Sequence, residues 1–165
     1  MLSFNKPIKH KKMEYLKEGD AAPEFTATDQ NGDKVSHTDF QGKKTILYFY
    51  PKDNTPGCTK EACDFRDNYE SLAKQGFQVI GVSADTEKSH RNFIDKYKLP
   101  FSLISDPEKG MIDKYHAWGP KKFMGKEYNG IHRITYVIDE EGKIEKTIAK
   151  VKTKEASKQV LEALA

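Results

Sequence analysis

Cysteine is scarce in this sequence: the 165-residue chain contains only Cys58 and Cys63, with four residues between them. Two cysteines are too few for a disulfide-rich scaffold, and a structural bridge between these two would close only a very short loop. A structural zinc site needs four ligands in recognisable pairs, whereas the five histidines of the chain show no Cys/His spacing motif. We therefore expect no metal. Two unrelated buried thiols, or a reactive cysteine with a neighbour, are the interpretations that remain.

Long apolar runs are also absent. Runs such as that from Thr45 to Tyr50 are far shorter than the ~20 residues that a transmembrane helix requires, which excludes a transmembrane protein. Aromatic residues, by contrast, are plentiful, with 9 Phe, 8 Tyr and 1 Trp. A disordered chain has few such residues, so we expect a packed core, and the length suits one globular domain.

Acidic residues are missing from the first twelve positions of the chain. Residues 1–12 hold four lysines and no acidic residue. The chain has 28 basic and 25 acidic residues, so residues 13–165 carry 28 less 4, or 24, basic residues against 25 acidic ones, and are nearly neutral. We expect residues 1–12 to be a basic, disordered extension and residues 13–165 to form the single domain. The extension lacks the apolar segment of a secretory signal and the arginines of a transit peptide, so we expect a cytoplasmic protein that binds neither nucleic acid nor membrane.

Strand-like and helix-like segments alternate along the chain. The pattern predicts a hairpin from 24–28 and 33–36, strands at 45–50, 78–83 and 101–104, and a closing hairpin from 133–139 and 143–149. It predicts helices from Pro56-Gly57 to Gly76, from Thr86 to Tyr97, from Asp106-Pro107 to about Tyr115, and from Thr153 to the end. Trp118 to Gly130 is expected to be a loop in which Trp118 and Phe123 pack. This order predicts an α/β fold with a central mixed sheet and helices on both faces.

The position of Cys58 favours a reactive thiol. It follows a buried strand and Pro56-Gly57, in the first turn of the predicted helix. Free backbone N–H groups and the helix dipole stabilise an anion there, and the thiolate is the reactive form of cysteine. Cys63 lies farther along the same helix and could act as a resolving thiol. The spacing is not the Cys-x-x-Cys of dithiol exchangers.

The segment from Tyr48 to Asp67, YFYPKDNTPGCTKEACDFRD, resembles the active-site segment of peroxiredoxins. It is most similar to the bacterioferritin-comigratory-protein branch, also called peroxiredoxin Q. Further similarity to this family is carried by KEGDAAPEF from Lys17, GPKKFMGK from Gly119 and GIHRITYVID from Gly130. The resemblance covers nearly all of the chain after residue 12. It implies a thioredoxin-like fold with an N-terminal hairpin, and thiol peroxidase activity.

The resemblance also implies roles for the residues around Cys58. Cys58 matches the peroxidatic cysteine, whose thiolate attacks the O–O bond and becomes a sulfenic acid. Thr55 matches a hydroxyl that hydrogen-bonds the peroxide and the thiolate, although it could be a plain turn residue. Pro51 matches the proline that shields the thiolate from water, and it can also end the strand.

Three more residues match family positions farther along the chain. Arg133 matches the arginine that completes the pocket, where a guanidinium lowers the thiolate pKa; without the resemblance it would be interpreted as a surface arginine. Glu61 fits a position that holds this arginine, and a first-turn helix acid would explain it equally well. Cys63 matches the resolving cysteine of part of the branch, which implies a Cys58–Cys63 redox disulfide.

The function that the resemblance implies is reduction of hydrogen peroxide and organic hydroperoxides by a monomer. Thioredoxin or a glutaredoxin-like donor would reopen the disulfide, and no metal, haem or flavin is needed. The competing hypothesis is a redox-sensing or holdase-type protein that reacts once, and a dithiol exchanger is disfavoured by the cysteine spacing. If both cysteines lie on an intact helix, their Cα atoms are ~8.6 Å apart. Disulfides rarely span more than ~7 Å, so the helix must unwind for the bond to form.

Overall fold

The structure is a computed structural model that describes residues 13–165, so the expected extension over residues 1–12 lies outside the described residues. The strands are β1 (Thr26–Asp29), β2 (Lys34–Ser36), β3 (Lys44–Phe49), β4 (Phe77–Ser83), β5 (Ser102–Ser105), β6 (Trp118–Phe123), β7 (Lys126–Ile131), β8 (Ile134–Ile138) and β9 (Ile144–Ile148). The helices are α1 (Pro56–Asp67), α2 (Tyr69–Lys74), α3 (Glu87–Tyr97), α4 (Gly110–Lys114) and α5 (Ala156–Leu164), with short 3₁₀ helices at His37–Phe40 and Thr153–Glu155.

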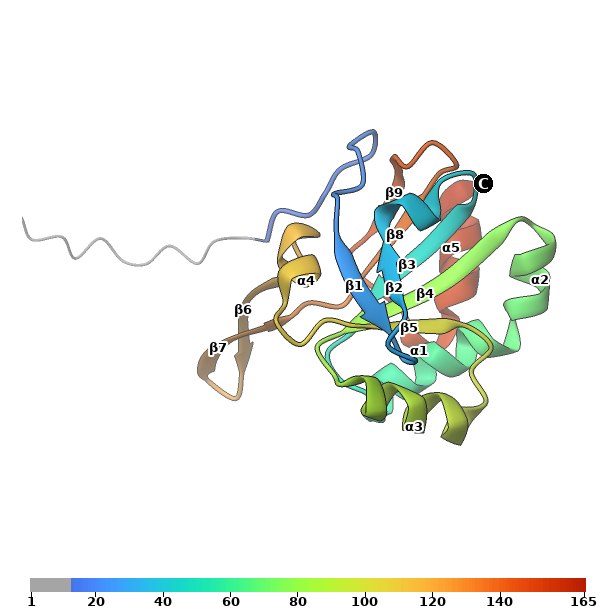
Figure 1. Ribbon diagram of the computed structural model, residues 1–165. Coiled ribbons are helices and arrows are strands. Elements are labelled where there is room, and N and C mark those ends of the chain that lie inside the picture. The colour runs from blue at the N-terminus through green and yellow to red at the C-terminus, as the bar shows by residue number, and fades with distance from the viewer. Residues whose placement is uncertain (1–12) are drawn as a thin grey trace, which may run out of the picture.

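Seven strands form one mixed sheet in the order β2-β1-β5-β4-β3-β8-β9 (Figure 1). Strands β3, β4 and β5 run parallel, as expected for strands joined by the helical crossovers α1–α2 and α3. β8 pairs antiparallel with β3, and β9 with β8, which makes the sheet mixed as predicted. The expected α/β fold, with a central mixed sheet, helices on both faces and an N-terminal hairpin, is confirmed.

Strand β3 lies at the centre and is covered on both faces. Leu47 and Phe49 pack in a cluster that includes residues of α4, whereas Ile46 and Tyr48 pack in a second cluster. The second cluster includes residues of α1, α2, α3 and α5. Alternate side chains of a strand point to opposite faces, so the continuous apolar run at 45–50 reflects two buried faces. No helix within residues 13–165 is long and apolar enough to cross a membrane.

The prediction of a loop from Trp118 to Gly130 is wrong. This segment is a β-hairpin, β6–β7, paired from Trp118↔Ile131 to Phe123↔Lys126. Met124 and Gly125 form its two-residue turn, with φ of 50° and 79°. The strands are mostly polar and lie outside the main sheet (Figure 1), so they lack the apolar alternation by which a strand is recognised. Phe123 is 65% exposed and does not pack as expected, whereas half-buried Trp118 contacts the core.

Two helix boundaries also differ from the prediction. The helix expected from Asp106 begins at Gly110, after a left-handed Lys109 with φ 64°. Asp106 still caps it, because its Oδ2 accepts the backbone N–H of Ile112 at 2.8 Å. The helix expected from Pro56 to Gly76 is divided at Asn68 into α1 and α2. Asn68 leaves helical geometry with φ −106° and ψ 6°, and its side chain donates to the carbonyl of Asp64.

Candidate active site

Cys58 is the third residue of α1. Thr55, in extended geometry, precedes the helix, and Pro56 occupies its first position, where the missing N–H removes no helical hydrogen bond. The backbone N–H groups of a first turn have no partner within the helix and stabilise negative charge. Cys58 is 1% exposed. Its thiol is therefore both shielded from water and placed where an anion is favoured.

Arg133 brings a positive charge to the sulfur. It lies between the end of β7 and the start of β8, and its Nη2 donates to the Sγ atom of Cys58 at 3.1 Å. Its Nη1 donates to Oε1 of Glu61 at 2.7 Å. Glu61 lies one helical turn after Cys58, so α1 presents the thiol and the carboxylate to the two arms of one guanidinium. Burial alone would lower the pKa of Arg133, but the charges of Glu61 and Cys58 outweigh it and leave this pKa raised.

Glu61 is fully buried. Burial raises its pKa to about 7, although the charge of Arg133 and its hydrogen bond act in the opposite direction. Oε2 of Glu61 has no hydrogen-bond partner among the described residues, and the same is true of the buried hydroxyl of Tyr48. A carboxylate with one unsatisfied buried oxygen is destabilised relative to the neutral acid, which is the physical cause of the shift. Glu61 therefore changes charge close to neutral pH, at the residue that holds Arg133.

Thr55 and Pro51 lie on the loop that joins β3 to α1. The hydroxyl of Thr55 donates to the carbonyl of Lys52 at 2.8 Å, and it makes no hydrogen bond to the Cys58 sulfur in the structure. Its lone pairs still allow it to accept another hydrogen bond. Pro51 is half-buried and follows the end of the buried strand. Arg133 thus joins Cys58 to Glu61 directly, whereas Thr55 and Pro51 lie on the loop before Cys58, and Thr55 makes no hydrogen bond to the thiol.

Cys63 lies five residues after Cys58 on the same continuous helix. Both cysteines are free thiols, Cys58 buried and Cys63 half-buried. On an α-helix this separation corresponds to ~7.5 Å of rise, and the side chains point ~140° apart. Both cysteines therefore lie on an intact helix, which is the arrangement in which we expected that a direct disulfide cannot form.

Lys121 is a site residue that the sequence did not indicate. Its Nζ donates to the carbonyl of Ile131 at 2.7 Å, two residues before Arg133. Burial lowers the pKa of Lys121 and the nearby Arg133 lowers it further, whereas Cys58 raises it. The segment was expected to be a loop, and only its pairing as β6 brings Lys121 back toward Arg133.

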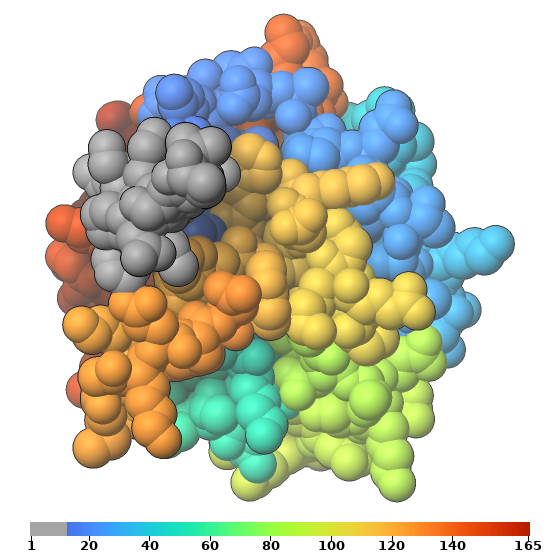
Figure 2. All heavy atoms as spheres, turned by 90° about the vertical axis from the view of Figure 1, so that its left-hand side faces the viewer, coloured from blue at the N-terminus to red at the C-terminus, as the bar shows by residue number. Residues whose placement is uncertain are grey.

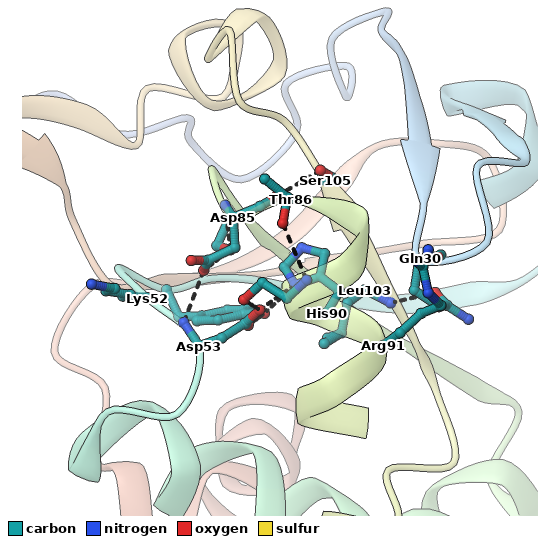
Figure 3. A network of polar contacts seen from close by, with 12 residues as sticks. Gln30, Lys52, Asp53, Asp85, Thr86, His90, Arg91, Leu103 and Ser105 are labelled. Atoms are coloured by element: carbon teal, nitrogen blue, oxygen red, sulfur yellow. Dashed lines mark hydrogen bonds and ion pairs between the residues drawn. The ribbon is translucent and has the colours of Figure 1, made fainter. Parts of the chain in front are cut away.

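Asp53, Asp85 and His90 lie close enough together to hold a metal ion. They were found among the residues that the structure describes. Their potential ligand atoms lie within 4.8 Å of one another. These atoms are already used in hydrogen bonds: both oxygens of Asp53 accept, Oδ2 of Asp85 accepts twice, and both nitrogens of His90 face oxygen atoms. The group is a polar network rather than an open cation site (Figure 3).

Comparison with known proteins agrees with this arrangement. Residues 18–147 match the AhpC/TSA family. The chain is 48% identical to peroxiredoxin Bcp of Escherichia coli over 86% of its own length and 90% of that protein. It is 45% identical to peroxiredoxin Bcp of Bacillus subtilis over 88% of its length and 93% of that protein.

Solved structures of this branch also superpose on the chain. A cysteine-to-serine mutant of Xylella fastidiosa PrxQ superposes with a TM-score of 0.85 at 27% identity, covering 92% of this chain and 96% of that one. The bacterioferritin comigratory protein of Xanthomonas campestris gives 0.82 at 33% identity, covering 92% and 97%. The chain therefore belongs to the AhpC/TSA family, and within it to the Bcp, or Q-type, peroxiredoxins, which are thiol-dependent peroxidases.

Proposed function

We propose that Cys58 is the peroxidatic cysteine of this thiol peroxidase. The observation that carries the proposal is the 3.1 Å contact between Nη2 of Arg133 and Sγ of Cys58 at the N-terminus of α1. A guanidinium stays charged at any working pH, so together with the free N–H groups of the first turn it favours the thiolate. No other cysteine of the chain lies in such an environment, because Cys63 is past the first turn of the helix.

In the first step the Cys58 thiolate attacks the terminal oxygen of the peroxide. An S–O bond forms, the O–O bond breaks, and the leaving oxygen takes up a proton to become water or an alcohol. Cys58 is oxidised to the sulfenic acid as the peroxide is reduced. Arg133 supports this step because its N–H groups stabilise the negative charge that moves from sulfur to the leaving oxygen.

Three further residues support the first step. Glu61 holds Arg133 beside the sulfur through an ion pair, in which Nη1 of Arg133 lies 2.7 Å from Oε1 of Glu61. The Thr55 hydroxyl accepts a hydrogen bond from the bound peroxide, since its own proton is directed to the Lys52 carbonyl. Pro51 limits the access of water to the thiolate from the loop side.

In the second step the Cys63 thiol attacks the sulfenic acid of Cys58 and releases water, which leaves a Cys58–Cys63 disulfide. The helical separation of the two residues requires the start of α1 to unwind before the sulfurs can meet. A dithiol donor then reduces the disulfide by exchange and is itself oxidised. Thiols supply all the electrons of this cycle, so it uses no metal, haem or flavin.

Membership of the family implies a peroxide substrate and a thiol reductant. We infer that the peroxides are hydrogen peroxide and small organic hydroperoxides, and the Xanthomonas campestris relative is described with alkyl peroxide reduction activity. We infer that the reductant is thioredoxin or a glutaredoxin-like dithiol protein. The catalytic groups all come from one chain, which is consistent with a monomer, and two free thiols suit the reducing cytoplasm.

The decisive experiment is peroxide-dependent NADPH oxidation coupled through thioredoxin reductase and thioredoxin. We expect many equivalents of peroxide to be consumed per chain, and none above background with Cys58→Ser. Consumption that stops after one equivalent while thioredoxin remains reduced would mean a redox sensor instead. Activity that survives in Cys58→Ser but not in Cys63→Ser would reverse the proposed roles of the two cysteines.

A further inference from the structure

Asp53 joins the loop before α1 to helix α3. Its carboxylate is buried, with 7% of the residue exposed. Oδ1 accepts a hydrogen bond from the hydroxyl of Tyr50 at 2.6 Å. Oδ2 accepts from the hydroxyl of Ser89 at 2.8 Å and faces Nδ1 of His90 at 2.7 Å (Figure 3). One side chain thus connects the end of β3, the loop and the first half of α3.

His90 is the buried partner of Asp53 in this network. Its ring is fully buried, and Nε2 lies 2.9 Å from the carbonyl oxygen of Ile104, which can only accept. Nδ1 faces a carboxylate that already accepts two hydroxyl protons. Both ring nitrogens thus face oxygen atoms, and the Asp53 carboxylate is the partner of Nδ1. Removal of one member of this buried pair leaves a polar atom of the other without its hydrogen-bond partner, so the two depend on each other.

The next residue of the loop is fixed to the same helix. Asn54 has a left-handed backbone with φ 59°, and its Oδ1 accepts from the hydroxyl of Tyr97 at 3.0 Å and from Nζ of Lys96 at 3.3 Å. The backbone N–H of Asp53 donates to Oδ2 of Asp85 at 2.8 Å. The chain is therefore held at residues 53 and 54, immediately before Thr55 and the start of α1.

The chain becomes free of these contacts at Pro56-Gly57. Proline restricts the residue before it to extended geometry, and Thr55 has φ −91° and ψ 157°. Gly57, with no side chain, can change its backbone angles at low energetic cost. In Figure 2 the teal surface of the segment that leads into α1 lies between lime-green α3 and the orange β6–β7 region. The loop is thus fixed on its α3 side, whereas Arg133 is the contact to Cys58 from the other side.

We propose that Asp53 and His90 are a positioning pair for the peroxidatic site. The pair holds the loop on α3 while the start of α1 unwinds for the disulfide and reforms afterwards, with the hinge at Pro56-Gly57. Cys58 then returns to the same place at Arg133 after every cycle. This inference rests on the proposed role of Cys58, and neither residue touches the reacting atoms.

The test compares variants of the full chain by the second-order rate constant for the reaction of the reduced enzyme with hydrogen peroxide. Asp53→Ala leaves Nδ1 of His90 without its partner, and we expect a loss of about tenfold or more, since small misplacements of a reacting group have effects of at least this size. Asp53→Asn keeps a hydrogen bond to His90, and we expect rescue to within about threefold of the unmodified chain. Arg91→Ala is the matched control, because Arg91 is next to His90 and joins α3 to the carbonyl of Gln30 instead of the loop. We expect an unchanged rate constant for it.

Amide exchange separates positioning from a purely structural role. In the unmodified enzyme, oxidation should speed exchange at 59–63 and leave the amide of residue 53 protected, whereas Asp53→Ala should speed exchange at residue 53 in both redox forms. If Asp53→Ala loses thermal stability but reacts with peroxide at the normal rate constant, the positioning role is wrong. If this variant does not fold, Tyr50→Phe, which removes one donor to Asp53, provides the same comparison, with an expected loss of about threefold. Activity that survives in Cys58→Ser would instead overturn the proposed function, so the two failures are distinguishable.

Discussion

Gly57 leaves the space that the guanidinium of Arg133 occupies. A Cβ atom at position 57 would lie 3.3 Å from Nη2 of Arg133, tighter than an ordinary van der Waals contact. Arg133 cannot move aside freely, because its Nη1 is bonded to buried Glu61 at 2.7 Å. A side chain at position 57 would therefore crowd Arg133. This steric effect favours glycine next to Cys58 independently of the flexibility of the glycine backbone.

Gly57→Ala should slow the peroxidase with little net change in the free energy of unfolding. Alanine favours a helix over glycine by up to about 1 kcal/mol, which offsets the cost of straining the bond between Arg133 and Glu61. The displaced guanidinium should lower the rate constant with peroxide several-fold. Stopped-flow kinetics and urea unfolding measure the two quantities on the same samples. A normal rate constant would show that Arg133 adjusts without leaving the sulfur.

Arg133→Ala should lower the rate constant with peroxide by about 100-fold, the effect of removing one donor that stabilises a developing negative charge. It should also slow the alkylation of Cys58 by iodoacetamide, because the thiolate loses its counter-charge. Arg133→Lys should restore only part of the rate, since an ammonium cannot donate to Cys58 and Glu61 in one plane. Lys122→Ala, at an exposed position of β6, is the control. Equal rates for Arg133→Ala and this control would remove Arg133 from the reaction.

Glu61→Gln should change how stability depends on pH. The pKa of Glu61 is raised in the folded chain from 4.5 to about 7, so the folded state holds the proton more tightly than the unfolded state does. This contribution to stability is fully present below pH 4.5 and is lost as the pH rises to about 7, by roughly 3 kcal/mol. Glutamine does not titrate, so the variant should lack this loss. Urea unfolding at several pH values measures the difference between the two chains.

The same substitution should alter the pH profile of the reaction. Above pH 7 the ionised Glu61 holds Arg133 with a charge-assisted bond, whereas the protonated acid below pH 7 holds it less firmly. The rate constant of the unmodified chain should therefore contain a rise near pH 7 that Glu61→Gln lacks. Identical profiles for the two chains would contradict the assigned role of Glu61.

Cys63→Ser should stop the cycle at the sulfenic acid. Peroxide should still oxidise Cys58 once, and a dimedone-type reagent should trap the product, because no thiol in the variant can condense with it. The unmodified chain, treated in the same way, should give the disulfide and a lower far-UV helical signal. Mass spectrometry and circular dichroism provide the two measurements. A disulfide that forms with no loss of helix would mean that α1 does not need to open.

Local sequence patterns were sufficient for most of the fold. Thr86 accepts the N–H of Ser89 at the start of α3, as a capping residue should, and the run at 45–50 lies in β3 with both faces covered. Hairpin β6–β7 could not be predicted in this way. Its strands are exposed and polar, and its stability depends on backbone pairing and on the turn at Met124-Gly125.

The candidate site could be predicted from the sequence only in part. The position of Cys58 follows from a local helix signal, but its contact with Arg133 spans 75 residues and was expected only from the family resemblance. The Asp53–His90 pair spans 37 residues and is formed by a lone acid in a loop and a lone histidine on a helix. Neither residue has a distinguishing pattern in the sequence, so the pair becomes visible only when the fold brings the loop onto α3.

Helix α1 is anchored at its far end as well as before its start. Asp64 accepts the backbone N–H of Ser157 in α5 at 2.7 Å, and Arg66 donates to the carbonyl of Tyr97 at 2.8 Å. The break at Asn68 separates α1 from α2. Only the few residues between Pro56 and Asp64 can therefore gain conformational freedom when the helix opens. A short segment with fixed ends, closed further by a disulfide, has few conformations to explore, so little chain entropy must be lost again when the disulfide is reduced and the helix reforms.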